Sequence, residues 1–84
     1  MTAIDQCREC LDCISAVLGK HTFMWQHVKR IHAFVVVDRC DGDTFRSVLS
    51  EYPINRHDII VSIYFVPMLE QASACIQIEA LASA

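Results

Sequence analysis

The chain has 84 residues, of which 54% are hydrophobic and 20% are charged. This apolar content excludes an intrinsically disordered chain, and two Gly and two Pro exclude collagen-like or low-complexity sequence. Seven basic against ten acidic residues give a net charge of -3, the wrong sign for a protein that contacts phosphates over its whole surface. We therefore expect a single compact domain over residues 1–84, and we do not expect it to bind nucleic acid or a membrane.

The number of cysteines gives an indication of the cellular compartment. Five cysteines are an odd number, so disulfide pairing within the chain would leave one thiol over. The first residues carry frequent charges and no apolar stretch of the kind found in a signal peptide. We expect a cytoplasmic protein with reduced thiols, most of them buried, and no cofactor.

The clearest predicted element is an N-terminal helix. Its apolar residues recur at intervals of three and four, which places them on one side of a helix: Ile4, Cys7, Leu11, Ile14 and Leu18. Thr2 suits the N-cap, with Asp5 able to complete a capping box, and Gly19 suits the position that follows the helix.

Residues 20–32 fit two structures. A second helix could begin at Thr22 and place Met24, Val28 and Ile31 on one face, and this is the structure that we slightly favour. Alternatively, the aromatic residues Phe23 and Trp25 could begin a strand.

A β-α-β unit is predicted over residues 33–66. The β-branched run from Ala33 to Asp38 is typical of a buried strand, and Ile59–Val66 forms a second such run. Between them, Thr44 can cap a short helix over Phe45–Tyr52 that Pro53 ends. The spacing suits a crossover between parallel strands, so we predict an α+β fold with helices packed on a sheet of two to four strands.

The last segment is predicted as a helix that begins at Pro67, with a strand over Cys75–Ala80 as the alternative. As a helix it would be apolar on opposite sides, and a domain of this size can bury only one of them. We therefore predict a partner interface, for which Cys13 adds an exposed thiol on the first helix. The predicted interface residues are Cys13, Ala74, Cys75, Ile78 and Leu81.

The triplet Cys7, Cys10 and Cys13 is the strongest candidate for a metal or iron–sulfur site. Its spacing begins like that of bacterial ferredoxins, but Val17 stands where the fourth cysteine would be needed. On a helix the three thiols would point away from one another, so we expect no metal site and keep metal binding as an alternative.

The segment 20–32 also carries a local excess of positive charge. It contains Lys20, Lys29 and Arg30 together with three histidines, and it contains no acidic residue. These three basic residues are the candidates for binding an anion or a nucleic acid, which is the second alternative.

No catalytic pattern stands out, and a chain of this length rarely encloses a large pocket. We therefore expect a non-enzymatic protein without a small-molecule substrate. The predicted function is protein–protein interaction as a homodimer, an adaptor or a small inhibitor, for example a viral inhibitor of host defence of the anti-CRISPR kind.

Overall fold

A computed structural model describes residues 2–54, 57–71 and 73–83 of the chain. Along the chain these residues form helix α1 (Ala3–Lys20), a 3-10 turn η1 (Trp25–His27), strand β1 (Val28–Val36), helix α2 (Gly42–Leu49), strand β2 (Ile60–Val66) and strand β3 (Ile76–Ala82). The predicted α+β class is confirmed. Within the described residues, no helix is both long enough and apolar enough to cross a membrane.

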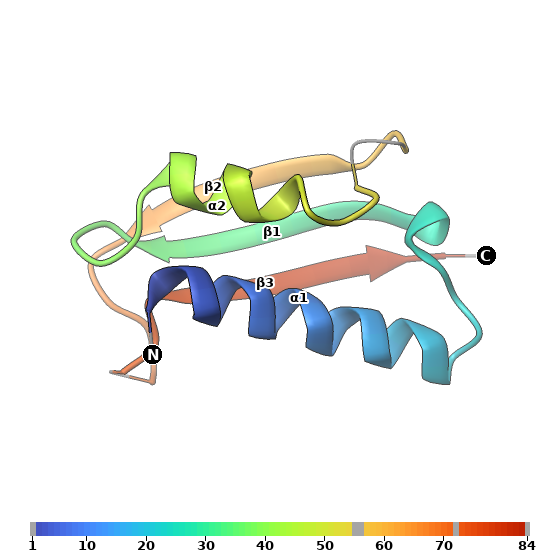
Figure 1. The fold of residues 1–84 in the computed structure, drawn as a ribbon, viewed down its shortest axis with the longest axis horizontal. Helices are drawn as coiled ribbons and strands as arrows, with labels where there is room; N and C mark the ends of the chain where they lie inside the picture. Colours follow the sequence, from blue (N-terminus) through green and yellow to red (C-terminus); the bar gives the residue numbers. More distant parts are fainter. Residues whose placement is uncertain (1, 55–56, 72, 84) are drawn as a thin grey trace.

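The three strands form one mixed sheet in the order β2-β1-β3. Strand β1 pairs in parallel with β2 and antiparallel with β3, so the predicted β-α-β unit is also confirmed. Both helices lie on the same side of the sheet, α2 near β2 and α1 along β3 (Figure 1). The opposite face of the sheet is left without a helix.

The alternation of side chains along β1 fixes which residues face the helices. Ile31, Ala33 and Val35 are completely buried and belong to the core on the helix side. Successive side chains of a strand point to opposite faces, so His32 and Phe34 lie on the face without helices. The core is completed from the helices, with Cys7 and Leu11 of α1 and Phe45 and Val48 of α2.

The ends of the helices follow local capping rules, with two corrections. The Thr2 hydroxyl accepts a hydrogen bond from the Asp5 backbone N–H at 3.1 Å, as predicted. Gly19, however, remains inside α1, and the residue with positive φ (59°) is Thr22. Helix α2 begins earlier than predicted because the Asp41 carboxylate, rather than Thr44, is its cap and accepts from the Thr44 N–H at 2.6 Å.

The favoured helix within residues 20–32 is wrong. Residues from Val28 onward belong to β1, where Val28 pairs with Ala82 and Ile31 with Ala80. The buried alternation extends back to Ile31, and an irregularity in the pairing between Val28 and Arg30 leaves Lys29 and Arg30 both exposed. The preceding 3-10 turn, η1, is stabilised by His27, whose Nδ1 accepts a hydrogen bond from the Met24 N–H at 2.8 Å.

The favoured helix after Pro67 is also wrong, and the alternative strand is right. Helix propensity in this segment is outweighed because the second edge of β1 offers a complete row of backbone partners. The pairing begins where the Val36 N–H donates to the Cys75 carbonyl oxygen at 2.9 Å. Successive side chains of a strand alternate between two faces. The residues that the predicted helix grouped into apolar stripes are therefore divided between the two faces of the sheet.

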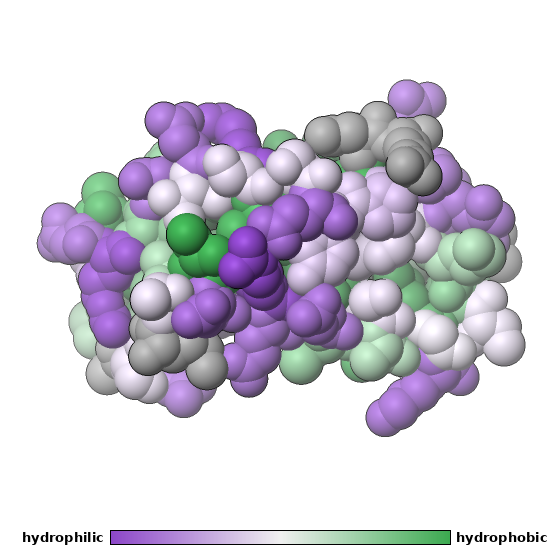
Figure 2. Space-filling model, in the orientation of Figure 1, coloured by the Kyte–Doolittle hydropathy of each residue, from purple (hydrophilic) through white to green (hydrophobic). Residues whose placement is uncertain are grey.

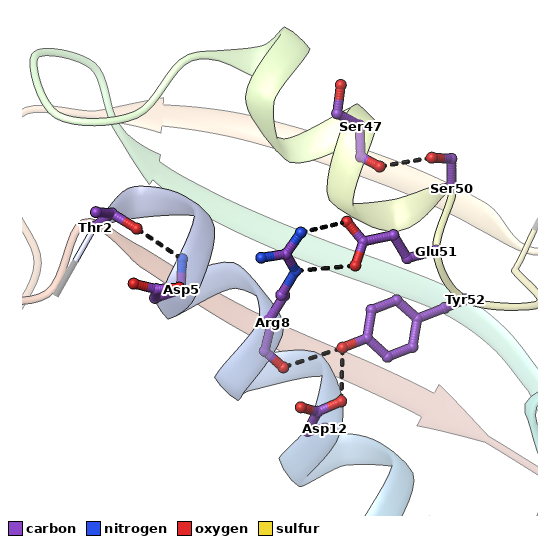
Figure 3. Close-up of polar contacts among 8 residues, drawn as sticks. All are labelled: Thr2, Asp5, Arg8, Asp12, Ser47, Ser50, Glu51 and Tyr52. Carbon is purple, nitrogen blue, oxygen red and sulfur yellow. Dashed lines mark hydrogen bonds and ion pairs between the residues drawn. The ribbon is translucent and has the colours of Figure 1, made fainter.

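Polar contacts join the two helical segments across the front of the molecule (Figure 3). Arg8 donates two hydrogen bonds to the Glu51 carboxylate at 2.9 and 2.8 Å. The Tyr52 hydroxyl donates to the Asp12 carboxylate at 2.6 Å, and burial together with this bond raises the pKa of Tyr52 to about 12. Hydrophilic residues accordingly gather over the middle of this side in the space-filling view (Figure 2).

Two leucine substitutions test the position of the core. Leu11 is completely buried, whereas Leu81 is 61% exposed. We expect Leu11→Ala to lower the free energy of unfolding by about 2–5 kcal/mol, a large share of the stability of a small domain, because it leaves a cavity. Leu81→Ala is the matched control and should change it by less than about 1 kcal/mol. Equal losses in urea denaturation would contradict this core.

Candidate functional site

A groove of about 840 Å³ lies between α1 and β3. Cys7 and Leu11 of α1 point into the core, so the residues that flank them on the helix surface turn toward β3. The helix-facing side chains of β3 form the opposite wall. The apolar lining residues are Ile14, Val17 and Leu18 of α1 and Ile76, Ile78 and Ala80 of β3.

The polar lining of this α1–β3 groove includes a cluster near the start of β3. The Gln6 side chain accepts from the Cys75 N–H at 2.8 Å and donates to the Ser73 carbonyl oxygen at 3.4 Å. Arg39 donates to the same carbonyl oxygen at 3.3 Å. Gln6 therefore holds α1 to the segment that leads into β3, and Arg39 brings a positive charge to the groove.

The predicted interface residues are divided by the strand. Cys13, Ala74 and Ile78 line the α1–β3 groove. Cys75 is only 2% exposed, so it is a core residue, and Leu81 is exposed on the other face of the sheet. The helical stripe that would have grouped Ala74, Cys75, Ile78 and Leu81 is not formed.

The Cys7, Cys10 and Cys13 triplet is spread around α1. Cys7 is buried, Cys10 is partly buried and Cys13 is exposed, and all three are free thiols. Among the described residues, no group of three or more His, Cys, Asp or Glu side chains could hold a metal ion. The alternative of a metal or iron–sulfur site on this triplet is therefore not supported.

A different set of thiols meets in the core. Cys7 of α1, Cys40 of the loop after β1 and Cys75 at the start of β3 are buried in one cluster. Burial and the neighbouring Cys40 thiol raise the pKa of Cys7 to about 12, and burial also raises the pKa of Cys40. A thiol that stays protonated is a poor nucleophile, so this cluster is structural.

Thiol labelling of the folded protein tests this division. Cys13 is exposed and should react with a thiol reagent at neutral pH, while Cys7, Cys40 and Cys75 should react only after unfolding. Peptide mapping after brief alkylation identifies the modified residues. Early modification of Cys7 at the rate of Cys13 would contradict the buried cluster.

The three predicted anion-binding residues have different surroundings. Lys20 is the last residue of α1. Lys29 lines a second hollow of about 370 Å³ together with His57 and Asp58. Arg30 lies in β1 and pairs with Ile60 on one side and Leu81 on the other.

Sequence reasoning missed the face of the sheet without helices. Arg30, His32 and Phe34 lie on this face, since Ile31 and Ala33 between them are buried on the other. The sequence contains this alternation, but an interpretation of residues 20–32 as a helix hides it.

No protein-family model and no curated protein matches the chain. Among solved structures, the chain is similar to a protein of Thermotoga maritima described as a "putative endoribonuclease". The identity is 24%, the TM-score is 0.86, and the match covers 100% of this chain and 64% of that one. The likeness shows that the two share a fold, and the chain spans less than two thirds of the other protein.

This match corrects the predicted function. The fold is shared with a protein described as a "putative endoribonuclease", and this finding overturns the predicted function of a small inhibitor or adaptor. The expectation of a non-enzymatic protein is not tested by this match and stays a prediction. The prediction of an inhibitor or adaptor failed because the apolar surface assigned to a protein partner rested on a helix that is a strand. Of its residues, Cys13, Ala74 and Ile78 line the groove, whereas Cys75 is buried in the core and Leu81 lies on the other face of the sheet.

Proposed function

We propose that the chain binds a small, elongated and mainly apolar molecule with a negatively charged end in the α1–β3 groove. The observation that carries this proposal is the groove itself, whose volume of about 840 Å³ falls in the range of small-molecule sites. From Gln6 to Val17 the wall formed by α1 is about 16 Å long at the rise of a helix.

The side chains suggest how such a ligand lies. Ile14, Val17 and Ile78 supply apolar contacts along the groove, and Arg39 supplies a guanidinium group near Gln6 and Ser73. A guanidinium group recognises a carboxylate through charge-assisted hydrogen bonds. The apolar chain of the ligand would then lie against α1 and β3, with its anionic end at Arg39.

The residues that line the groove favour binding without catalysis. The titratable groups in the lining are Glu9, Cys10, Cys13 and Arg39. Burial raises the pKa of Cys10, so this thiol is not activated for attack. The likeness to a protein described as a "putative endoribonuclease" concerns the fold and does not specify a ligand. Self-association and a cytoplasmic location stay predictions.

Decanoate and decyltrimethylammonium test the proposal, since they have the same alkyl chain and opposite charge. Calorimetry should show that decanoate binds more tightly. Arg39→Gln should weaken decanoate binding about tenfold or more, because a charge-assisted bond is lost, and Arg46→Gln on α2 is the matched control. Equal binding of the two probes, or equal effects of the two arginine variants, would contradict the assigned charge.

A second pair of variants tests the apolar wall. Val17 lines the groove and is 52% exposed, whereas Val37 is 56% exposed and lies outside it. Val17→Asp should abolish decanoate binding, because the alkyl chain would remove water from the new carboxylate without giving it a partner, and Val37→Asp should leave binding unchanged. The melting temperature of each variant shows that the fold is retained. Unchanged binding by Val17→Asp would place the ligand elsewhere.

A further inference from the structure

The face of the sheet without helices carries three rows of paired side chains. Residues paired across neighbouring strands share a face, so each row runs from β2 through β1 to β3. The central row joins Ser62, His32 and Glu79. The row on one side joins Ile60, Arg30 and Leu81, and the row on the other side joins Tyr64, Phe34 and Gln77.

The central row contains a polar atom without a partner. The Nε2 atom of His32 is buried and makes no hydrogen bond to any of the residues that the structure describes. The Tyr64 ring packs edge-on against the imidazole, with the ring centres 5.8 Å apart and the planes at 75°. Since a buried and unpaired polar atom destabilises the fold, its retention at a surface of this kind indicates a hydrogen bond made to a ligand.

Beside His32 lies an aromatic platform. The rings of Phe34 and Tyr64 are stacked, with their centres 5.2 Å apart and an angle of 20° between them. Tyr64 is 45% exposed and belongs to an edge strand, so its ring can turn away from His32 without disturbing the core. Exposed aromatic rings on a sheet bind planar heterocycles by stacking.

Arg30 lies on the same face of β1 as His32 and Phe34, on the opposite side of His32 from Phe34. Phe34 is four positions further along the strand, a distance of about 13 Å. The exposed Arg30 side chain can reach back over much of this distance, and its row partners Ile60 and Leu81 are uncharged. The facing charged groups are therefore Arg30 at one end and Glu79 beside His32. A ligand that extends from Phe34 to Arg30 needs a ring that stacks at Phe34, a polar group that bonds to His32 and an anionic group at Arg30.

We propose that this face binds a mononucleotide. The base stacks on the Phe34 and Tyr64 rings, a polar group of the base or ribose bonds to His32 Nε2, and the phosphate pairs with Arg30. Arg30, His32, Phe34 and Tyr64 do not line the α1–β3 groove, so either proposal can fail without the other.

NMR titration of the labelled protein with AMP tests the proposal, with adenosine and ribose 5-phosphate as probes that lack the phosphate or the base. AMP should shift the resonances of Arg30, His32 and Phe34 and bind at least tenfold more tightly than either fragment. Binding of ribose 5-phosphate as tight as that of AMP would reduce the site to general anion binding and overturn the proposal. So would shifts confined to the groove, or the absence of shifts at millimolar AMP.

Two variants separate binding from folding. His32→Phe removes Nε2 and keeps a ring, so it should weaken AMP binding at least fivefold while the melting temperature stays equal or rises. A purely structural His32 would give a lower melting temperature and unchanged AMP affinity, which would overturn its assigned role. Arg30→Gln should lower AMP affinity to that of adenosine, whereas Arg46→Gln, on the other side of the sheet, should not.

Discussion

Pairing of β1 on both of its edges is the constraint from which the rest of the structure follows. The strand exchanges backbone hydrogen bonds with β2 in parallel and with β3 antiparallel, so its side chains have only the two faces of the sheet to occupy. Ile31, Ala33 and Val35 take one face and are completely buried beneath the helices. The residues between them must then lie on the other face, whatever their polarity.

Both candidate sites are consequences of this division. On the helix side, α1 turns Cys7 and Leu11 toward β1 and so presents its next row of side chains to β3, which creates the α1–β3 groove. On the other side, His32 and Phe34 meet partners from β2 and β3 in fixed register. The sheet separates an apolar groove from a polar and aromatic surface.

The sequence predicts the elements whose signals are local. The spacing of Leu11 and its neighbours and the Thr2 cap define α1, and the β-branched runs define the cores of β1 and β2. What could not be predicted is decided by distant partners. Residues 76–82 have helical propensity, yet they form β3 because the free edge of β1, distant in sequence, is available in space.

The candidate sites show the same limit. Cys13, Ala74 and Ile78 were found from their apolar character and do lie at one groove, but the reason for their grouping was wrong. His32 could not be recognised, since its importance depends on pairing with Ser62 and Glu79 from strands that follow much later. Residue type and spacing reveal a face only once the element that carries it is assigned correctly.

The register of β1 is tested most directly by nuclear Overhauser effects between backbone protons of neighbouring strands. The structure requires cross-strand contacts from His32 to Ser62 on β2 and from His32 to Glu79 on β3. A register of β3 displaced by one residue, with His32 opposite Ala80, would turn Glu79 toward the helices and contradict the account.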